Sequence, residues 1–320
     1  MKPASALVLA CLLLLPACVR RPGGPAPGRP EAVSLLGAPL YPPELPHEAR
    51  QRLEAQLDTA RRAYERNPDD ADALIWYGRR TAYLGRYHDA IGIFTEGIRR
   101  HPRDPRMYRH RGHRWITVRR FGRAASDLQR AARLARGRPD EPEPDGVPSA
   151  RGVPRSTLQG NIWYHLGLAY YLQGDFARAA WAFRECLGLA QNDDSRVAAA
   201  DWLYMSLRRL GREAEAAAVL DVVRPGMDVV ENASYLRRLR MYRGELPPDS
   251  LLDPAGKDAL EVATQGYAVG NWHLYHGRRD EAEEVFWRVT AAENWAPFGY
   301  IAAEAELRRT LRRKGFRPPR

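Results

Sequence analysis

Two histidines on one predicted helix have the spacing of a metal site. His110 and His113 are three residues apart, so their imidazoles would project from the same helix face, where they could bind a transition metal. Their neighbours are Arg109, Arg111 and Arg114, and no carboxylate lies within one helical turn. Positive charge beside the imidazoles repels a divalent cation. We therefore expect no metal site at this pair.

The other groups that could do chemistry are carboxylates and one thiol. Glu281, Glu283 and Glu284 crowd one segment, but their spacing places them on the outward side of a helix, in solvent. Cys186 falls at a small, buried helix position, which is typical of an inert core thiol. The chain contains no P-loop, no G-x-S-x-G and no H-E-x-x-H sequence. We expect no catalytic residue, no metal and no cofactor, and therefore a protein that is not an enzyme.

The N-terminus has the pattern of an export signal. Lys2 precedes an apolar run, 4–15, which is too short to span a bilayer and is typical of a secretory signal peptide. The sequence Leu-Pro-Ala-Cys at 15–18 resembles the lipobox of bacterial lipoproteins. This resemblance implies that residues 1–17 are a cleaved signal peptide and that Cys18 is lipidated. The alternative is a plain signal peptide that is cut near Ala17.

The lipobox resemblance also implies a location. A lipidated Cys18 would attach the protein to a membrane, since more than one acyl chain holds stably. Val19 stands where an aspartate favours inner-membrane retention, so the resemblance implies the bacterial cell envelope, facing the periplasm and at the outer membrane. Residues 18–46 are rich in Pro and Gly and show no apolar periodicity, which predicts a tether.

Composition limits the class of protein. The 320 residues carry a net charge of +11 with 44% hydrophobic residues, and no stretch of about 18 apolar residues occurs, which excludes a polytopic membrane protein. The three lysines contrast with a large excess of arginine, a bias typical of a GC-rich coding sequence. Because an exported protein does not meet the genome, we expect no nucleic-acid partner despite the charge.

Beyond residue 47 the sequence repeats. Segment 160–193 contains Trp163, Leu166-Gly167, Tyr170, Ala179 and Phe183. The small residues would let two antiparallel helices approach, and the large ones would fill the space between them. Similar offsets recur upstream and downstream, and Gly112 follows Gly78 at the interval of a helix–turn–helix repeat of about 34 residues.

This pattern resembles the tetratricopeptide repeat (TPR) family and in particular bacterial TPR lipoproteins of unassigned role. The resemblance implies an all-α fold, an α-solenoid of TPR helix pairs (an α-α superhelix). We expect N-terminal repeats at 47–136, an acidic, Pro-rich surface loop at 137–157, and C-terminal TPR-like repeats with a capping helix at 158–316. Pro247-Pro248 breaks one unit, leaving a single helical turn at 249–252.

Partner-binding positions follow from the same resemblance. TPR proteins bind ligands through fixed positions of the first helix of each pair, which line a concave groove. Carried onto this sequence, the groove residues are Arg79, Tyr83, Arg106, Arg109, His113, Asn161, Tyr164, Tyr171, Arg208 and Arg209. Such a cationic and aromatic groove would suit an extended peptide that bears carboxylates.

The sequence therefore predicts a non-catalytic scaffold or adaptor at the bacterial cell envelope, which holds a protein or peptide partner in its groove. The alternative is a binder of an anionic envelope component (lipopolysaccharide, acidic phospholipid or peptidoglycan) through an arginine-rich surface. Salt separates the two, because binding through scattered arginines weakens steeply with ionic strength.

Overall fold

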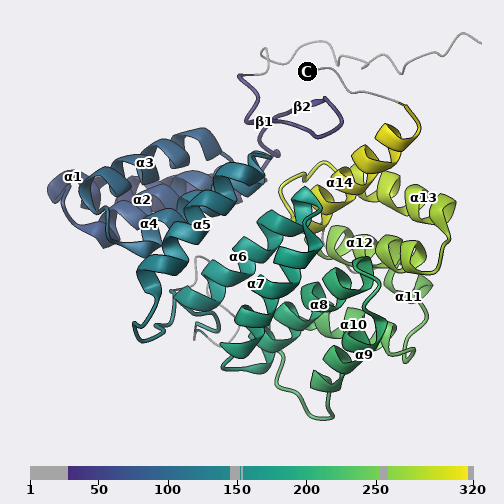
Figure 1. Cartoon of the computed structure of the whole chain (residues 1–320). Coiled ribbons are helices and arrows are strands. Elements are labelled where there is room, and N and C mark those ends of the chain that lie inside the picture. The colour runs from purple at the N-terminus through teal and green to yellow at the C-terminus, as the bar shows by residue number, and fades with distance from the viewer. Residues whose placement is uncertain (1–27, 145–151, 153, 253–258, 316–320) are drawn as a thin grey trace, which may run out of the picture.

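The computed structural model describes residues 28–144, 152, 154–252 and 259–315. Within these residues it contains fourteen α-helices, one 3₁₀ turn and one short hairpin (Figure 1). The elements are β1 (Ala32–Val33), β2 (Pro39–Leu40), α1 (His47–Arg66), α2 (Ala71–Tyr83), α3 (Tyr87–Arg100), α4 (Pro105–Thr117), α5 (Phe121–Ala135), α6 (Leu158–Gln173), α7 (Phe176–Gly188), α8 (Asp193–Arg209), α9 (Glu213–Val219), η1 (Leu220–Val222), α10 (Ala233–Tyr242), α11 (Asp249–Leu252), α12 (Ala259–Tyr275), α13 (Arg279–Thr290) and α14 (Phe298–Arg313).

The helices pack as antiparallel pairs that stack side by side. The pairs are α2–α3, α4–α5, α6–α7, α8–α9 and α12–α13, and the neighbouring first helices α2, α4, α6 and α8 contact one another in turn. We call the surface that these first helices form the inner face. The chain is thus the expected α-solenoid, and it curls until α12 and α14 contact the middle of the stack (Figure 1). The single helical turn expected at 249–252 is α11.

A glycine in the first helix of a pair makes the close packing possible. At each such position an added Cβ would lie between 2.4 and 2.7 Å from a large side chain of the second helix. Because no Cβ fits there, the repeat spacing read from the sequence is a packing requirement. The glycine–partner pairs are Gly78–Phe94, Gly112–Leu128, Gly167–Phe183 and Gly270–Phe286.

The turn inside each pair needs a left-handed residue. Gly85, Gly174 and Gly277 have φ values of 76°, 86° and 76°, which glycine adopts without steric cost. Arg119 holds the same place between α4 and α5 with a φ of 62°. This conformation is strained for a residue with a side chain, so contacts of the Arg119 side chain must offset the strain.

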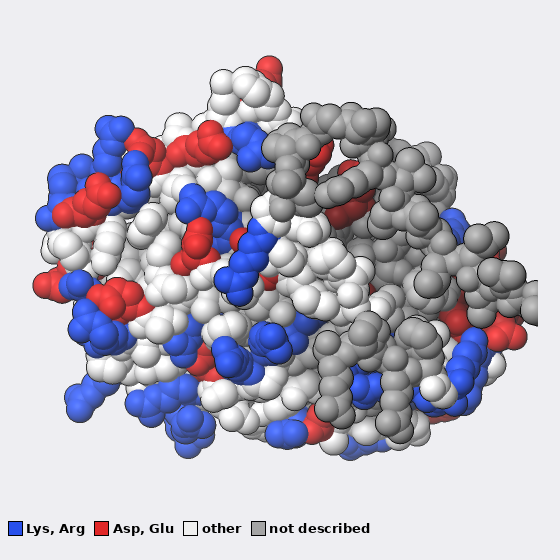
Figure 2. All heavy atoms as spheres, turned by 90° about the horizontal axis from the view of Figure 1, so that it is seen from above, with Lys and Arg blue, Asp and Glu red and all other residues white. Residues whose placement is uncertain are grey.

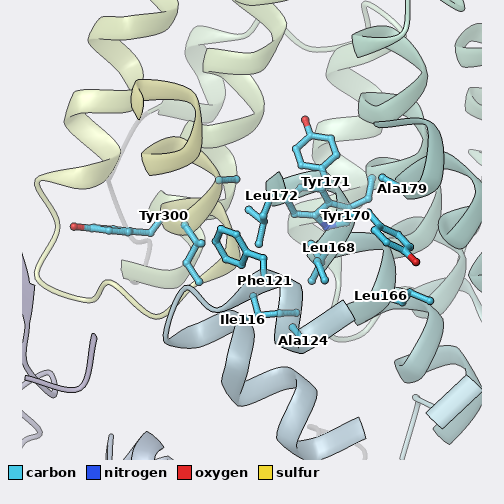
Figure 3. Packing of buried hydrophobic residues seen from close by; sticks show 14 of the residues in the cluster. Ile116, Phe121, Ala124, Leu166, Leu168, Tyr170, Tyr171, Leu172, Ala179 and Tyr300 are labelled. Carbon is cyan, nitrogen blue, oxygen red and sulfur yellow. The ribbon is translucent and has the colours of Figure 1, made fainter. Parts of the chain in front are cut away.

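One hydrophobic core runs through both predicted repeat arrays. Phe121 of α5 lies beside Leu168 and Leu172 of α6 in a cluster that also contains Tyr300 of α14 (Figure 3). The same cluster extends from Leu74 in α2 to the last helix. The segments on either side of the 137–157 loop are therefore joined by packing, not only by the chain.

Residues 28–46, the described part of the predicted tether at 18–46, are folded against the repeats. Strands β1 and β2 form an antiparallel hairpin in which Ala32 and Leu40 are buried. Trp295 donates its indole N–H to the carbonyl of Tyr41, and the amide of His88 donates to Glu31 at 2.9 Å. The apolar residues of 32–41 explain the difference, because they can be buried against the repeats despite the prolines around them.

The predicted capping helix is also different. In α14 every residue from Gly299 to Leu307 is buried, including the carboxylates Glu304 and Glu306. The backbone of Gly299 lies so close to α12 that a Cβ would be 2.4 Å from the carbonyl oxygen of Ala263. The first half of α14 therefore packs inside the curl of the solenoid instead of covering its end. The sequence pattern missed this because the arginines that indicated an outer face lie only in the second half.

In the part of the chain that the structure describes, no helix is long and apolar enough to cross a membrane. The predicted signal peptide and Cys18 lie outside the described residues.

Candidate partner-binding surface

The N-terminal residues of the predicted groove lie on the inner face, but most of their charges are already paired. Arg106 of α4 pairs with Asp104 at 2.6 Å and also with Asp72 of α2. Arg79 donates to the hydroxyl of Tyr83 at 3.4 Å, and its guanidinium lies 4.4 Å from the centre of the Trp76 ring. This end of the groove is cationic and aromatic, as expected, with Arg106 held by carboxylates of its own chain.

Arg109 does not face an open groove. Its side chain is 9% exposed and donates to Glu143 at 2.9 Å, a residue of the 137–157 loop that is equally buried. The backbone of 141–143 pairs with 156–158, through bonds of 2.9 Å from the Glu143 amide to Ser156 and from the Leu158 amide to Glu141. The part of this loop around Glu143 is therefore packed against the inner face.

His113 lies deeper than a groove position would. Its ring centre is 4.4 Å from that of His165 in α6 and 5.3 Å from that of Phe298 in α14. Burial holds the pKa of His113 and of His165 well below 6.5, so both rings are neutral near pH 7. Within the described residues no cluster of histidine, cysteine and carboxylate groups could hold a metal ion.

Three groove residues of the C-terminal half are held within the chain. Tyr171 is 1% exposed and accepts hydrogen bonds from Tyr267 and Asn271 of α12, each at 2.7 Å. Arg209 pairs with Glu306 of α14. Tyr171 and Arg209, which were predicted to contact a partner, therefore have their hydrogen-bond and ion-pair partners in α12 and α14 of the same chain.

Arg208, the third of these residues, is half-buried among aromatic rings. Its guanidinium lies 5.0 Å from the ring centre of Tyr275 and donates to the hydroxyl of Tyr204 at 3.2 Å. The nearest carboxylate, that of Glu213, is 3.7 Å away. Arg208 is thus a contact between α8 and the end of α12, and the inner face has no open cationic position there.

Asn161 and Tyr164, the two remaining predicted residues, line a cleft of about 640 Å³. It lies between α6, α8, α10, α12 and the start of α14, on the inner side of the curl. We call it the aromatic cleft, after the rings of Tyr164, His165, Tyr235 and Phe298 that line it. Polar groups of Asn161, Ser234, Thr264, Arg237 and Glu261 also line it.

A buried carboxylate fixes one wall of the aromatic cleft. Asp194 at the start of α8 is 1% exposed, and it accepts the backbone N–H groups of Val230, Glu231 and Asn232 at 2.8–3.0 Å. Arg155 donates to the same carboxylate at 2.8 Å. These bonds to the carboxylate hold the loop that leads into α10, and so they position Tyr235 over the cleft.

The rings of the cleft form a hydrogen-bonded set. Tyr164 accepts from the indole N–H of Trp202 at 2.9 Å and shares a 2.7 Å hydrogen bond with the hydroxyl of Tyr235. Burial raises the pKa of Tyr164 well above 10, so the phenol stays neutral. The geometry suits a rigid, partly apolar pocket that accepts an apolar or aromatic side chain and offers hydrogen bonds around it.

The thiol at the cleft wall is not activated. Cys186 is buried, as expected, and burial raises its pKa to about 12. Its sulfur lies 3.5 Å from the carbonyl of Gly160, and the nearby charge of Asp140 also raises the pKa of the thiol. His165, which also lines the cleft, uses Nδ1 for the carbonyl of Asn161 at 2.6 Å, and this bond fixes the orientation of its ring. Both side chains therefore have the arrangement of packed core residues.

Sequence reasoning missed the residues that close the cleft. Asp194, Tyr235 and Phe298 do not fall at ligand positions of the repeat pattern. The sequence nevertheless marks these regions, because segments 231–235 (Glu-Asn-Ala-Ser-Tyr) and 298–304 do not follow the repeat pattern. The structure brings the first segment and the start of the second to the same cleft.

No protein-family model and no curated protein matches this chain. Solved structures with a similar course of helices include YrrB, described as a TPR protein with an unusual peptide-binding site, at 15% identity and a TM-score of 0.43, covering 78% of this chain and 98% of YrrB. PilF of Pseudomonas aeruginosa is similar at 16% identity and a TM-score of 0.45, covering 80% and 91%. A tetratricopeptide repeat protein of Parabacteroides merdae is similar at 13% identity and a TM-score of 0.49, covering 81% and 93%.

Proposed function

We propose that this protein is a non-catalytic scaffold that binds a segment of a partner protein on its inner face, with the aromatic cleft as the anchoring pocket. The observation that carries the proposal is the cleft itself. It is a hollow of about 640 Å³ lined by Tyr164, Tyr235 and Phe298, held open by the Asp194 loop. Buried aromatic pockets with a polar rim are where partner side chains contribute most binding energy.

Crosslinking from the cleft tests this proposal. Ala233 is exposed at the cleft, whereas Ala217 is exposed on α9 and does not line the cleft. A photo-crosslinking residue at position 233 is expected to capture a discrete partner in cells, and the same residue at position 217 is not. The variant Ala233→Trp, which fills the opening, should release the partner, and Ala217→Trp should retain it. Equal crosslinking from both positions would remove the cleft from the mechanism.

We also propose that Cys18 anchors the scaffold in a bacterial cell envelope, facing the periplasm. The support is the lipobox-like sequence at 15–18 and the apolar run before it. Wild-type protein should incorporate an alkyne-labelled fatty acid and sediment with membranes, and Cys18→Ser should do neither. Labelling that persists in Cys18→Ser would contradict this assignment.

The alternative is an arginine-rich surface that binds an anionic envelope component. Many exposed arginines have carboxylate neighbours, such as Arg99 with Glu96 and Arg184 with Glu215, both at 2.6 Å. Figure 2 shows acidic side chains beside many of the basic ones on this view of the surface. A partner that dissociates between low and physiological salt would favour the alternative, whereas a cleft-anchored partner should remain bound.

A further inference from the structure

A stretch of acidic chain lies on the cationic end of the inner face. We call residues 141–144 (Glu-Pro-Glu-Pro) the acidic segment. It is extended and runs antiparallel to 156–158, and its residue Glu143 places a carboxylate on Arg109 of α4 at 2.9 Å. The segment lies in an insertion, because Gly112 and Gly167 are separated by more than one repeat of about 34 residues. It is therefore not part of the repeat packing.

The ion pair that holds the acidic segment is incomplete. A carboxylate on a guanidinium fork normally forms two parallel hydrogen bonds. Here only one oxygen of Glu143 is paired with Arg109, and the second oxygen (Oε2) and Arg109 Nε are both buried without a hydrogen-bond partner. Arg109 therefore retains an unused donor toward a carboxylate that approaches with better geometry.

Space and positive charge adjoin this pair. A hollow of about 250 Å³ lies between the acidic segment and the helices α2 and α4, where Trp76, Arg79, Arg106 and His110 line it together with Asp72. Burial lowers the pKa of Arg109, and the nearby charge of Arg79 lowers it further. Two arginines thus lie close together in a poorly hydrated place, with Glu143 as the buried carboxylate that offsets them.

We propose that the acidic segment occupies the place of an acidic, proline-containing segment of a partner protein, whose carboxylate displaces Glu143 from Arg109. This inference rests on the proposed function, because it takes the inner face as the partner surface. It adds the chemical class of the partner at the α2–α4 part of that face, where residues 156 and 157 separate the acidic segment from the aromatic cleft.

The intrachain occupant has a predictable effect on affinity. A tethered segment competes at an effective concentration in the millimolar range, so a free acidic peptide binds wild-type protein weakly. Weakening the hold of the occupant increases the population of the open site, and the apparent affinity rises in proportion. Loss of the Glu143 charge should therefore tighten binding of an acidic peptide by about ten-fold or more.

The test uses the purified full chain and a fluorescein-labelled peptide, Pro-Asp-Glu-Pro-Glu-Pro, which copies residues 139–144. Fluorescence anisotropy should show at least about ten-fold tighter binding to Glu143→Gln than to wild type. The matched control Glu284→Gln removes the charge of an exposed glutamate of α13, which does not line this hollow, and should bind within about two-fold of wild type. Adding Arg109→Gln to Glu143→Gln should abolish the gain, and so should a peptide with glutamine in place of glutamate.

Hydrogen exchange gives an independent readout without a mutation. Saturating peptide on wild-type protein should speed exchange of the Glu143 and Leu158 amides, because their bonds to 156 and 141 break when the segment leaves. Equal peptide affinity of wild type and Glu143→Gln, with unchanged exchange, would overturn the proposal. Such a result would leave the crosslinking from position 233 unchanged. A failure of this inference can therefore be distinguished from a failure of the proposed function.

Discussion

The contact between Arg119 and α14 offers a quantitative test of how the solenoid closes. Arg119 is 8% exposed, donates to Glu304 at 3.0 Å and to the carbonyl of Trp295 at 2.9 Å, and lies 5.0 Å from the centre of the Trp295 ring. It does so from a turn with a φ of 62°, where the other repeats have glycine. The variant Arg119→Gly removes both the backbone strain of the turn and the contacts of the side chain, so its stability shows which of the two is larger.

The two effects have different sizes. Glycine relieves about 1–2 kcal/mol of left-handed strain. Removing one partner of a buried ion pair costs about 3–5 kcal/mol, since Glu304, which is 1% exposed, would be left buried without its counter-charge. We therefore expect Arg119→Gly to be less stable than wild type by about 1–4 kcal/mol. Glu304→Gln in the same chain should restore about 1 kcal/mol or more, because it removes the unpaired charge.

The pH dependence of this loss has a defined sign. Burial raises the pKa of Glu304 above its ordinary value of 4.5, and Arg119 opposes that rise. Without Arg119 the pKa of Glu304 in the folded state rises further, so in the folded variant this carboxyl stays protonated up to a higher pH. The destabilisation of Arg119→Gly should then be largest at pH 8 and shrink as the pH falls toward 4.5.

Guanidinium denaturation followed by tryptophan fluorescence measures these differences, with hydrogen exchange in α14 as a local readout, because repeat arrays can unfold in parts. An Arg119→Gly variant as stable as wild type would show that strain outweighs the ion pair. A deficit that is the same at pH 5 and pH 8 would show that the Glu304 charge is not its cause.

Three further predictions concern packing and the cleft. Gly167→Ala should lower the free energy of unfolding by about 1–3 kcal/mol, because its Cβ would lie 2.7 Å from the Phe183 ring. Gly92→Ala, whose Cβ would have nothing within 4 Å, should raise the free energy of unfolding by up to about 1 kcal/mol. Equal effects of the two substitutions would refute the packing argument. Asp194→Asn should speed amide exchange at 230–232 and abolish crosslinking from position 233, and unchanged exchange would exclude its role in the wall. In a chain that begins at residue 28, Cys186 should react with a thiol reagent at pH 8 more than about 100-fold slower than after unfolding, because its pKa is about 12; rapid labelling of folded protein would contradict its burial.

The helix pairs could be predicted from the sequence because their determinants are local. Gly167 and Phe183 lie in consecutive helices and meet across one turn, so a repeat of such pairs is visible as spacing alone. The one-turn helix at 249–252 was equally predictable, since Pro247-Pro248 prevents a longer one. Residues that close the aromatic cleft could not be derived in this way. Phe298 is far along the chain from Tyr164, and only the curl of the stack brings the two together.

Three arginines of the helix pairs, of which Arg109 and Arg209 are predicted groove residues, are paired within the chain for one physical reason. Ligand positions taken from a repeat pattern assume that the inner face is open, but here segments outside the repeats supply carboxylates to it. The pairs are Glu143 with Arg109, Glu304 with Arg119, and Glu306 with Arg209. In each pair the arginine comes from a helix pair or its turn, and the glutamate comes from the 137–157 loop or from α14. A buried guanidinium is costly without a counter-charge, so in a solenoid rich in arginine the additional segments neutralise the inner face. The proposed partner contacts therefore fall on groups outside these three pairs, such as the rings of the aromatic cleft, or on a pair that is incomplete, as at Arg109.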